Sequence, residues 1–145
     1  MIKIICFGKI KENYLNELIN DYLKRISKYH KIEIIELKDN DNILIEEKEL
    51  SNILNKKDYN IALDSHGNKF DSVDFAKHIN SLFNFNGTIT FIIGGSNGLT
   101  DNIKNDCNEL ISFSDFTFPH GLFRGILLEQ IYRSFKIKNN ETYHK

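Results

Sequence analysis

The sequence has 145 residues, of which 41% are hydrophobic and 27% are charged, and its formal net charge at pH 7 is −1. This composition predicts one globular domain, spanning residues 1–145, that is large enough to bury a single core. It argues against a membrane protein, because no apolar run approaches the roughly 20 residues that cross a bilayer, and against a protein that coats nucleic acid by charge alone.

The first half of the chain alternates between short apolar runs and longer amphipathic segments. The runs are rich in β-branched residues and predict strands, whereas the longer segments repeat their apolar residues at helical spacing. In chain order we expect a strand over 2–7, a helix over 12–29, a strand over 32–37, a helix over 43–57, a strand over 59–64 and a polar loop over 65–69.

The second half continues this alternation. Asp71 or Ser72 is placed to cap a helix, and Thr100 is placed to cap another that carries Ile103, Cys107 and Leu110. The other expected elements are a strand over 88–93, a fifth strand within 111–118 and a final helix over 122–137. Strands that alternate with helices predict an α/β fold with a mostly parallel sheet, covered by helices on both faces.

Two strand ends run directly into turns with few side chains, at residues 91–99 and 116–124. In α/β proteins such turns lie beyond the carboxyl ends of the strands, where ligands bind. The first turn, Gly94-Gly95-x-x-Gly98, does not match the G-x-G-x-x-G fingerprint of dinucleotide sites, and no phosphate-binding P-loop is present. The glycines therefore indicate either a tight structural turn or main chain that a ligand approaches closely.

Familiar catalytic motifs are missing. The five histidines form no H-E-x-x-H motif, no G-x-S-x-G turn occurs, and Cys6 and Cys107 lie too far apart for a C-x-x-C pair. We therefore expect no metal site and two reduced thiols in a cytoplasmic protein without a signal peptide. This pattern favours chemistry in which a bound cofactor carries the reactive group and the protein positions it.

Five ordered motifs, spread along the whole chain, make the sequence similar to a known family. They are Ala62-Leu63-Asp64 with Gly67, Phe91-Ile92-Ile93-Gly94-Gly95 with Gly98-Leu99, Thr117-Phe118-Pro119-His120, Leu128-Glu129-Gln130-Ile131-Tyr132-Arg133 and Tyr143-His144-Lys145. With them the chain resembles the ribosomal RNA large subunit methyltransferase H family, the smallest SPOUT methyltransferases. The resemblance implies an α/β fold with a C-terminal trefoil knot, a homodimer, S-adenosyl-L-methionine as cofactor, and no membrane or metal partner.

The implied substrate is 23S ribosomal RNA within the assembled ribosome, methylated at N3 of a pseudouridine in a hairpin at the subunit interface. The implied cofactor-binding residues come from three strand ends: Leu63, Gly94, Gly95, Phe113, Ser114, Asp115, Phe116, Thr117 and Phe118. Adenine needs apolar faces and a few main-chain groups, and a sulfonium needs no anion-binding nest.

The candidate catalytic residues lie near the C-terminus. His120 and His144 are candidates to accept the N3 proton, with a structural role as the alternative for each. Arg133 and Arg124 are candidates to pair with RNA phosphates or base carbonyls, although Arg133 can instead pair with Glu129 one turn earlier. Tyr143 is a candidate to stack on an unpaired base, unless the terminus is simply disordered.

One rival interpretation remains at this stage. The chain could be a noncatalytic nucleotide-binding module with a flavodoxin-like sheet, in which Gly94 and Gly95 hold a phosphate. Calorimetry with S-adenosyl ligands and with NAD or FMN separates the two.

Overall fold

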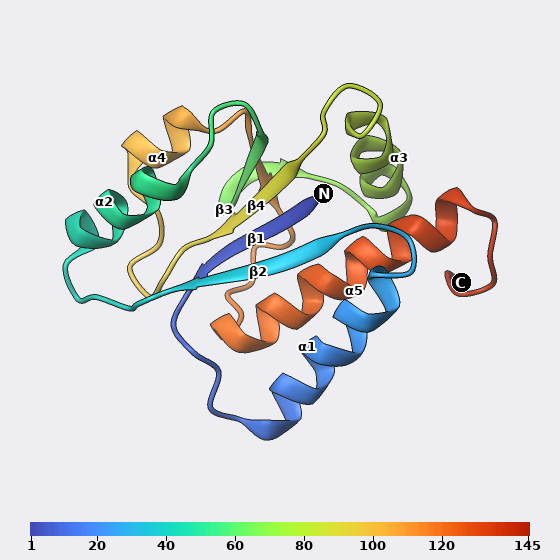
Figure 1. Ribbon diagram of the computed structural model, residues 1–145, viewed down its shortest axis with the longest axis horizontal. Coiled ribbons are helices and arrows are strands. Elements are labelled where there is room, and N and C mark those ends of the chain that lie inside the picture. The colour runs from blue at the N-terminus through green and yellow to red at the C-terminus, as the bar shows by residue number, and fades with distance from the viewer.

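The computed structural model describes residues 1–145, and its centre is a five-stranded sheet with the strand order β2-β1-β4-β3-β5. Every pair of neighbouring strands is parallel (Figure 1). The elements are β1 (Ile2–Phe7), α1 (Asn13–Ile26), β2 (Ile32–Leu37), α2 (Ile43–Ile53), β3 (Tyr59–Lys69), α3 (Ser72–Leu82), β4 (Ile89–Ile93), α4 (Asp101–Asp106), β5 (Glu109–Ser112) and α5 (His120–Lys138).

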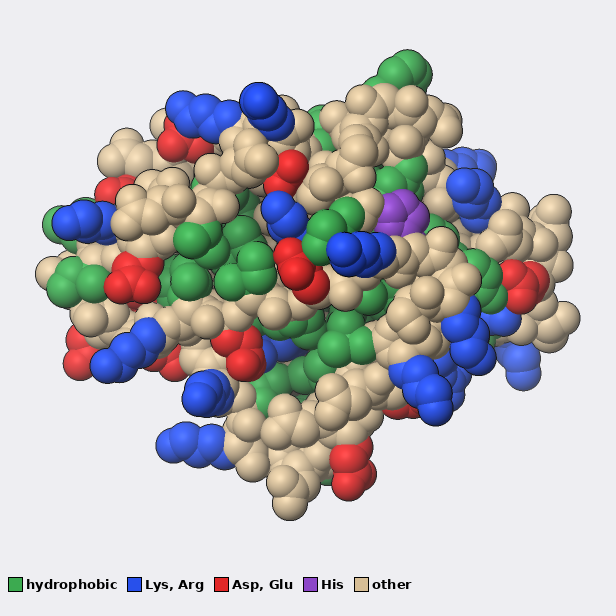
Figure 2. All heavy atoms as spheres, in the orientation of Figure 1, with side chains coloured by type: hydrophobic (Ala, Val, Ile, Leu, Met, Phe, Trp, Pro, Cys, Tyr) green, Lys and Arg blue, Asp and Glu red, His purple; other side chains and the backbone are tan.

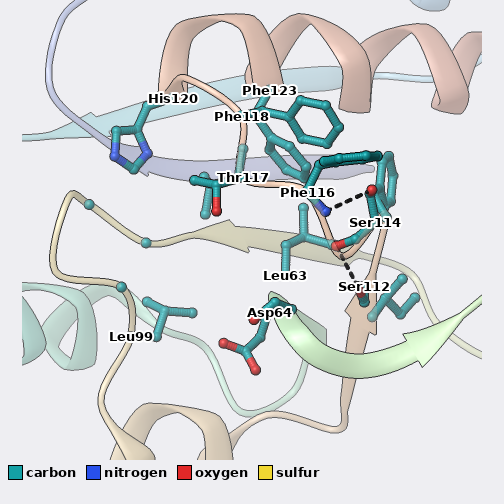
Figure 3. A pocket seen from close by; sticks show the side chains of 17 residues that line it. Leu63, Asp64, Leu99, Ser112, Ser114, Phe116, Thr117, Phe118, His120 and Phe123 are labelled. Atoms are coloured by element: carbon teal, nitrogen blue, oxygen red, sulfur yellow. Dashed lines mark hydrogen bonds between the residues drawn. The ribbon is translucent and has the colours of Figure 1, made fainter.

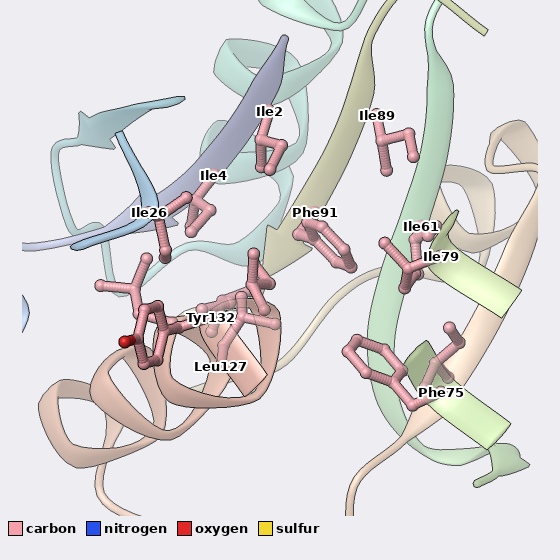
Figure 4. Close-up of a cluster of buried hydrophobic side chains, with 14 of the residues drawn as sticks. Ile2, Ile4, Ile26, Ile61, Phe75, Ile79, Ile89, Phe91, Leu127 and Tyr132 are labelled. Atoms are coloured by element: carbon pink, nitrogen blue, oxygen red, sulfur yellow. The ribbon is translucent and has the colours of Figure 1, made fainter. Parts of the chain in front are cut away.

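Successive side chains of a strand point to opposite faces of a sheet, and β1 is apolar on both. Ile2 and Ile4 belong to the larger buried cluster, together with residues of α1, α3 and α5 (Figure 4). Ile5 and Phe7 face the other way, in a smaller cluster that includes Leu50 of α2 and Ile103 of α4. The prediction of a parallel sheet with helices on both faces is thus confirmed.

Helix α5 is the longest helix and lies between α1 and α3, against the larger buried cluster. Its buried side chains include Leu127, Ile131 and Phe135, three of the four residues expected at helical spacing. On the side facing α1, a Cβ on Gly125 would come within 2.7 Å of Leu18 Cδ2. The glycine therefore allows the two helices to approach closely.

Both expected helix caps are present. The Asp71 carboxylate accepts a hydrogen bond from the Asp74 N–H at 2.7 Å, so Asp71 rather than Ser72 caps α3. Thr100 Oγ1 accepts from the Ile103 N–H at 3.3 Å and caps α4. The prediction was less accurate at the other helix ends, because α1 stops at Ile26 and α2 at Ile53.

Two strand predictions were wrong. β3 does not end at Asp64 but continues to Lys69, because both Leu63 and Asn68 pair with Ile111 of β5 and residues 64–67 form an irregularity between them. A Cβ on Gly67 would lie 2.6 Å from Ile111 N, so glycine is needed where this segment crosses β5. β5 comes earlier than expected and ends at Ser112, which leaves residues 113–119 as a loop.

Leu110 accordingly lies in β5 and not on the preceding helix. None of the helices combines the length and the apolar character needed to cross a bilayer.

Candidate functional site

A cavity of about 220 Å³ lies at the carboxyl ends of β4 and β5, beside the irregular segment of β3 that follows Leu63 (Figure 3). Three segments form its wall: residues 63–65 from β3, the glycine turn that follows β4, and the loop that follows β5. These strands are neighbours in the sheet, so they bring together segments that are far apart in the sequence. This is the position at which open α/β sheets bind ligands.

The geometry of the turn after β4 itself requires glycine, whether or not a ligand binds there. A Cβ on Gly94 would lie 2.7 Å from the carbonyl carbon of Gly98, and Gly98 has a φ of +74°. The Gly98 N–H donates to the Gly95 carbonyl oxygen at 2.9 Å and closes the turn. The structural interpretation of these glycines is therefore correct, and the same turn also lines the cavity.

The loop after β5 supplies the aromatic wall. Six residues of this loop were expected in the site, and five of them line the cavity: Phe113, Ser114, Phe116, Thr117 and Phe118. Ser114 holds the loop in place, because its Oγ accepts from the Phe116 N–H at 3.0 Å and its carbonyl oxygen accepts from Ser112 Oγ at 3.2 Å (Figure 3).

The remaining residue of that segment, Asp115, is not among the lining residues. It points to Lys69 of β3, with 2.6 Å between Oδ1 and Nζ. Phe116 is 81% exposed at the rim of the cavity, a large apolar surface left open to solvent.

The cavity carries very little charge. Asp64 is the only carboxylate among the lining residues, which include no Lys or Arg. Lys104 Nζ lies 3.1 Å from Asp64 Oδ1, and the His66 N–H donates to Asp64 Oδ2 at 3.1 Å. Burial by itself raises the pKa of Asp64, but the hydrogen bonds from Lys104 and His66 outweigh it, so the pKa lies below its ordinary value.

His120, the first residue of α5, also lines the cavity and is exposed to solvent. No group of three or more His, Cys, Asp or Glu side chains is arranged to hold a metal ion.

The other candidate residues meet at the far end of α5, in what we call the tail cluster: Glu129, Arg133, Tyr143 and His144. Arg133 Nε donates to Glu129 Oε1 at 3.0 Å, and Arg133 Nη1 donates to His144 Nδ1 at 3.0 Å. The Tyr143 hydroxyl donates to the same Glu129 oxygen at 3.0 Å, and the Arg133 guanidinium lies 4.8 Å from the centre of the Tyr143 ring. The alternative pairing of Arg133 with Glu129 is therefore present, and the C-terminal residues are held against α5.

Tyr143 is also fixed from a second side. Its hydroxyl lies 3.1 Å from that of Tyr22, and its ring packs edge-on against Tyr132. Burial raises the pKa of Tyr143 well above its ordinary range, and the hydrogen bonds to Tyr22 and Glu129 raise it further. The Tyr143 hydroxyl is therefore held in its protonated form.

The cavity and the tail cluster are well separated within one chain. His120 begins α5 and Arg133 lies thirteen residues later, which is about 20 Å along a helix at 1.5 Å per residue. The structure thus brings Arg133, Tyr143 and His144 together but places His120 with the cavity.

The expectation for Arg124 was wrong. Its side chain is buried, with 2.6 Å between its Nη1 and Glu36 Oε2, and its Nη2 donates to the Gly8 carbonyl oxygen at 3.1 Å. A guanidinium 3% exposed and tied to the ends of β1 and β2 is not available to RNA. The helical spacing did carry a signal, because Arg124 lies three and four residues before the buried Leu127 and Leu128, and the expectation gave more weight to its charge than to its position.

Sequence reasoning missed several cavity residues, among them Asp64, Leu99 and Phe123. Asp64 had a usable signal, since it is an acidic residue at the end of an apolar strand. Phe123 was expected only in the core face of the last helix, and it lies 5.4 Å from Phe113, ring centre to ring centre.

Comparison with known proteins agrees with this architecture. Residues 1–144 match the family described as predicted SPOUT methyltransferases. The chain is 47% identical to the ribosomal RNA large subunit methyltransferase H of Fusobacterium nucleatum and 44% identical to that of Malacoplasma penetrans, with 99% of each chain covered in both cases.

Two solved structures share the fold. A probable methylase family protein from Haemophilus influenzae superposes with a TM-score of 0.58 at 11% identity, covering 99% of this chain and 70% of the other. The SpoU methyltransferase AviRb from Streptomyces viridochromogenes gives a TM-score of 0.52 at 12% identity, covering 98% and 62%.

Proposed function

The chain belongs to the SPOUT methyltransferase family, and we propose that it methylates large-subunit ribosomal RNA with S-adenosyl-L-methionine as the methyl donor. The observation that carries the proposal is the cavity beside residues 63–65 of β3 and the ends of β4 and β5, which is lined by four Phe rings, three glycines, one carboxylate and no cationic Lys or Arg. The relatives' names support ribosomal RNA as the substrate.

The lining residues fit the parts of this donor. Phe113, Phe118 and Phe123 give apolar surface of the kind that adenine needs, and the main chain around Gly94 gives donors and acceptors close to the cavity. When bound, S-adenosylmethionine supplies a methyl group carried on a positively charged sulfur. The protein's contribution is to orient that group and to exclude water. Positioning of this kind supplies much of the rate of a methyl transfer.

The rival function, a module that binds a nucleotide phosphate, has less support. Phosphate sites use Lys or Arg, or a long helix whose free N–H groups face the anion. Here α4 has only six residues and begins at Asp101, and the backbone of Gly98 fills the space beside Gly94. We therefore expect calorimetry to detect binding of S-adenosylhomocysteine and none of NAD or FMN; the reverse result would contradict the proposal.

The target base must lose a proton from N3 when that nitrogen is methylated. His120 is the imidazole that lines the cavity, and imidazole is the side chain that most often accepts a proton in general base catalysis. His144 is the second candidate, and its Nδ1 already accepts a hydrogen bond from Arg133. We propose that the pseudouridine N3 is the methylated atom, which mass spectrometry of the modified nucleoside would test.

A second copy of the chain completes the site in this proposal. Because one chain separates the tail cluster from its own cavity by about 20 Å, Arg133, Tyr143 and His144 reach a bound base only from a partner chain. Exposed apolar residues near the starts of α1 and α5, Tyr14 at 69% and Leu122 at 37%, offer surface for such a homodimer. The stacking role of Tyr143 then requires its ring to leave Tyr132. The trefoil knot implied by the resemblance belongs to the same proposal.

The assembled ribosome is the proposed form of the substrate. Lys and Arg side chains gather on the side of the molecule where α5 ends (Figure 2), but the chain as a whole has a net charge of −1. With few phosphate contacts, affinity must come from a shaped surface that naked RNA lacks. We expect labelled methyl groups to pass to ribosomes much faster than to protein-free 23S ribosomal RNA; equal rates would contradict this.

A further inference from the structure

Asp64 occupies an unusual position for a charged side chain. It directly follows Leu63 at the floor of the cavity, its side chain is only 16% exposed, and it is the one carboxylate among the lining residues. Figure 3 shows the carboxylate between Leu63 and Leu99, on the side of the cavity away from the aromatic loop.

The surroundings of Asp64 keep it ionised. Its two oxygens are held by Lys104 Nζ and by the His66 N–H, each at 3.1 Å. Lys104 comes from α4, behind the cavity, and is not among the lining residues. His66 Nδ1 also lies 3.5 Å from Asp64 Oδ2, so Lys104 and His66 together offset part of the Asp64 charge. The charge that is left is the only negative side-chain charge among the residues that line the pocket.

We propose that Asp64 is a specificity-determining residue that makes the cavity prefer the cationic methyl donor to its neutral product. This inference rests on the proposed function. The donor carries a positive charge on sulfur, whereas the product, S-adenosylhomocysteine, is a neutral thioether that differs only by the transferred methyl group. A half-buried carboxylate is one of the few groups able to distinguish them, since their adenosine parts are the same.

The low exposure of Asp64 favours the sulfur over the amino group of the donor. The amino and carboxylate end of the donor is strongly hydrated, and it is best left near solvent. The sulfonium has no N–H or O–H to offer, so it responds to a nearby field without needing a hydrogen bond. A carboxylate that already uses its oxygens on Lys104 and His66 supplies such a field.

The same reasoning predicts a kinetic signature. The positive charge on sulfur fades as the methyl group leaves, so the attraction to Asp64 is stronger in the bound donor than in the transition state. Interactions of this kind tighten binding without raising the rate of the chemical step. Loss of the carboxylate charge is therefore expected to raise KM for the donor and to leave the single-turnover rate at saturation unchanged or higher.

The test is calorimetry of the full-length protein and its Asp64→Asn variant with three ligands. S-adenosylmethionine carries the sulfonium, sinefungin carries an amine near the same place, and S-adenosylhomocysteine carries neither. We expect Asp64→Asn to weaken binding of the two cationic ligands by about tenfold and that of S-adenosylhomocysteine by less than about threefold. Asp106→Asn is the matched control, because Asp106 is exposed on α4, the helix that also carries Lys104, and does not line the cavity.

A second variant tests the opposite direction. Lys104→Met removes the partner that partly neutralises Asp64, so the preference for the cationic ligands over S-adenosylhomocysteine should increase. Thermal unfolding shows whether each variant folds. If Asp64→Asn does not fold, the ligand preference of Lys104→Met still tests the proposal.

Three outcomes decide between the hypotheses. If Asp64→Asn loses affinity equally for all three ligands, or for none of them, the assignment of Asp64 is overturned and the proposed function is left intact. A wild-type protein that binds none of the ligands would instead overturn the proposed function itself.

Discussion

The two ends of helix α5 meet very different surroundings. At His120 the helix borders a cavity lined by glycines, aromatic rings and one carboxylate, whereas at Arg133 it carries a network of tyrosines and ion pairs. The function of the cavity depends on its shape, so substitutions that add atoms to its wall should impair ligand binding most. The tail cluster is defined by charges and hydrogen bonds, so removed groups should damage it most.

The largest effect should come from adding a Cβ at the turn of the cavity. Gly94→Ala places that atom 2.7 Å from the backbone of Gly98, where no flexible side chain can yield, and we expect S-adenosylhomocysteine affinity to fall more than about a hundredfold with a stability loss of about 1–3 kcal/mol. Calorimetry measures the affinity and thermal unfolding the stability.

Gly87→Ala is the matched control, since a Cβ there meets nothing within 4 Å. Undiminished binding by a folded Gly94→Ala protein would mean that the turn does not shape the site.

The next effect should come from the opposite end of α5. Arg133→Gln removes a cation bonded to Glu129 and His144, and we expect methyl transfer to ribosomes to fall about 10- to 100-fold with S-adenosylhomocysteine affinity nearly unchanged. Lys138→Gln, an exposed cation on the same helix, serves as control. A parallel loss of cofactor binding in Arg133→Gln would argue against separate roles for the two ends.

These two variants also test the partner-chain proposal. In a heterodimer of one Gly94→Ala chain and one Arg133→Gln chain, one of the two composite sites retains both an intact cavity and an intact tail cluster. Heterodimers purified through two different tags should therefore recover about half of the wild-type activity per dimer. Activity no higher than that of the two parent variants would show that each chain works with its own tail.

A smaller effect is expected at the rim of the cavity. Phe116 is 81% exposed beside the cavity. If its ring stacks on the adenine, Phe116→Ala should weaken the binding of S-adenosylhomocysteine about five- to tenfold. Phe85→Ala is the control, because Phe85 is equally exposed in the α3–β4 connection and does not line the cavity. If Phe116→Ala binds S-adenosylhomocysteine as tightly as the wild-type protein does, the Phe116 ring does not contact the cofactor and serves another partner.

The smallest effect is expected from an ion pair that ties the cavity loop to β3. Both members of the Lys69–Asp115 pair are largely exposed, at 55% and 80%, so Lys69→Gln should change stability by less than about 0.5 kcal/mol. Chemical denaturation measures this. A loss above about 1 kcal/mol would show that the loop depends on charge and not on the shape that Ser114 and the aromatic rings give it.

Local patterns in the sequence were enough to predict the alternating elements, the two caps at Asp71 and Thr100, and the glycine turn after β4. They were not enough where long-range pairing decides the structure. The extension of β3 to Lys69 depends on β5, and no local feature of residues 65–69 indicates a strand. The burial of Arg124 likewise depends on Glu36, 88 residues away.

The resemblance identified the segments of the cavity, but its wall includes residues that no motif singled out. Asp64 was quoted only as part of a motif, and its isolation among uncharged residues became visible only once the three strand ends were placed together. The contacts of Tyr143 and His144 with Glu129 and Arg133 were also hidden, because these two residues lie beyond the end of α5 and fold back on it.

The most direct test of the account is to map the cofactor on the protein by NMR. Titration of ¹⁵N-labelled protein with S-adenosylhomocysteine should shift the amide resonances of residues 63–65, 94–99 and 112–118 most strongly, because these segments form the cavity wall. Saturation without shifts in those three segments, or with the largest shifts on the far side of the sheet, would contradict the account.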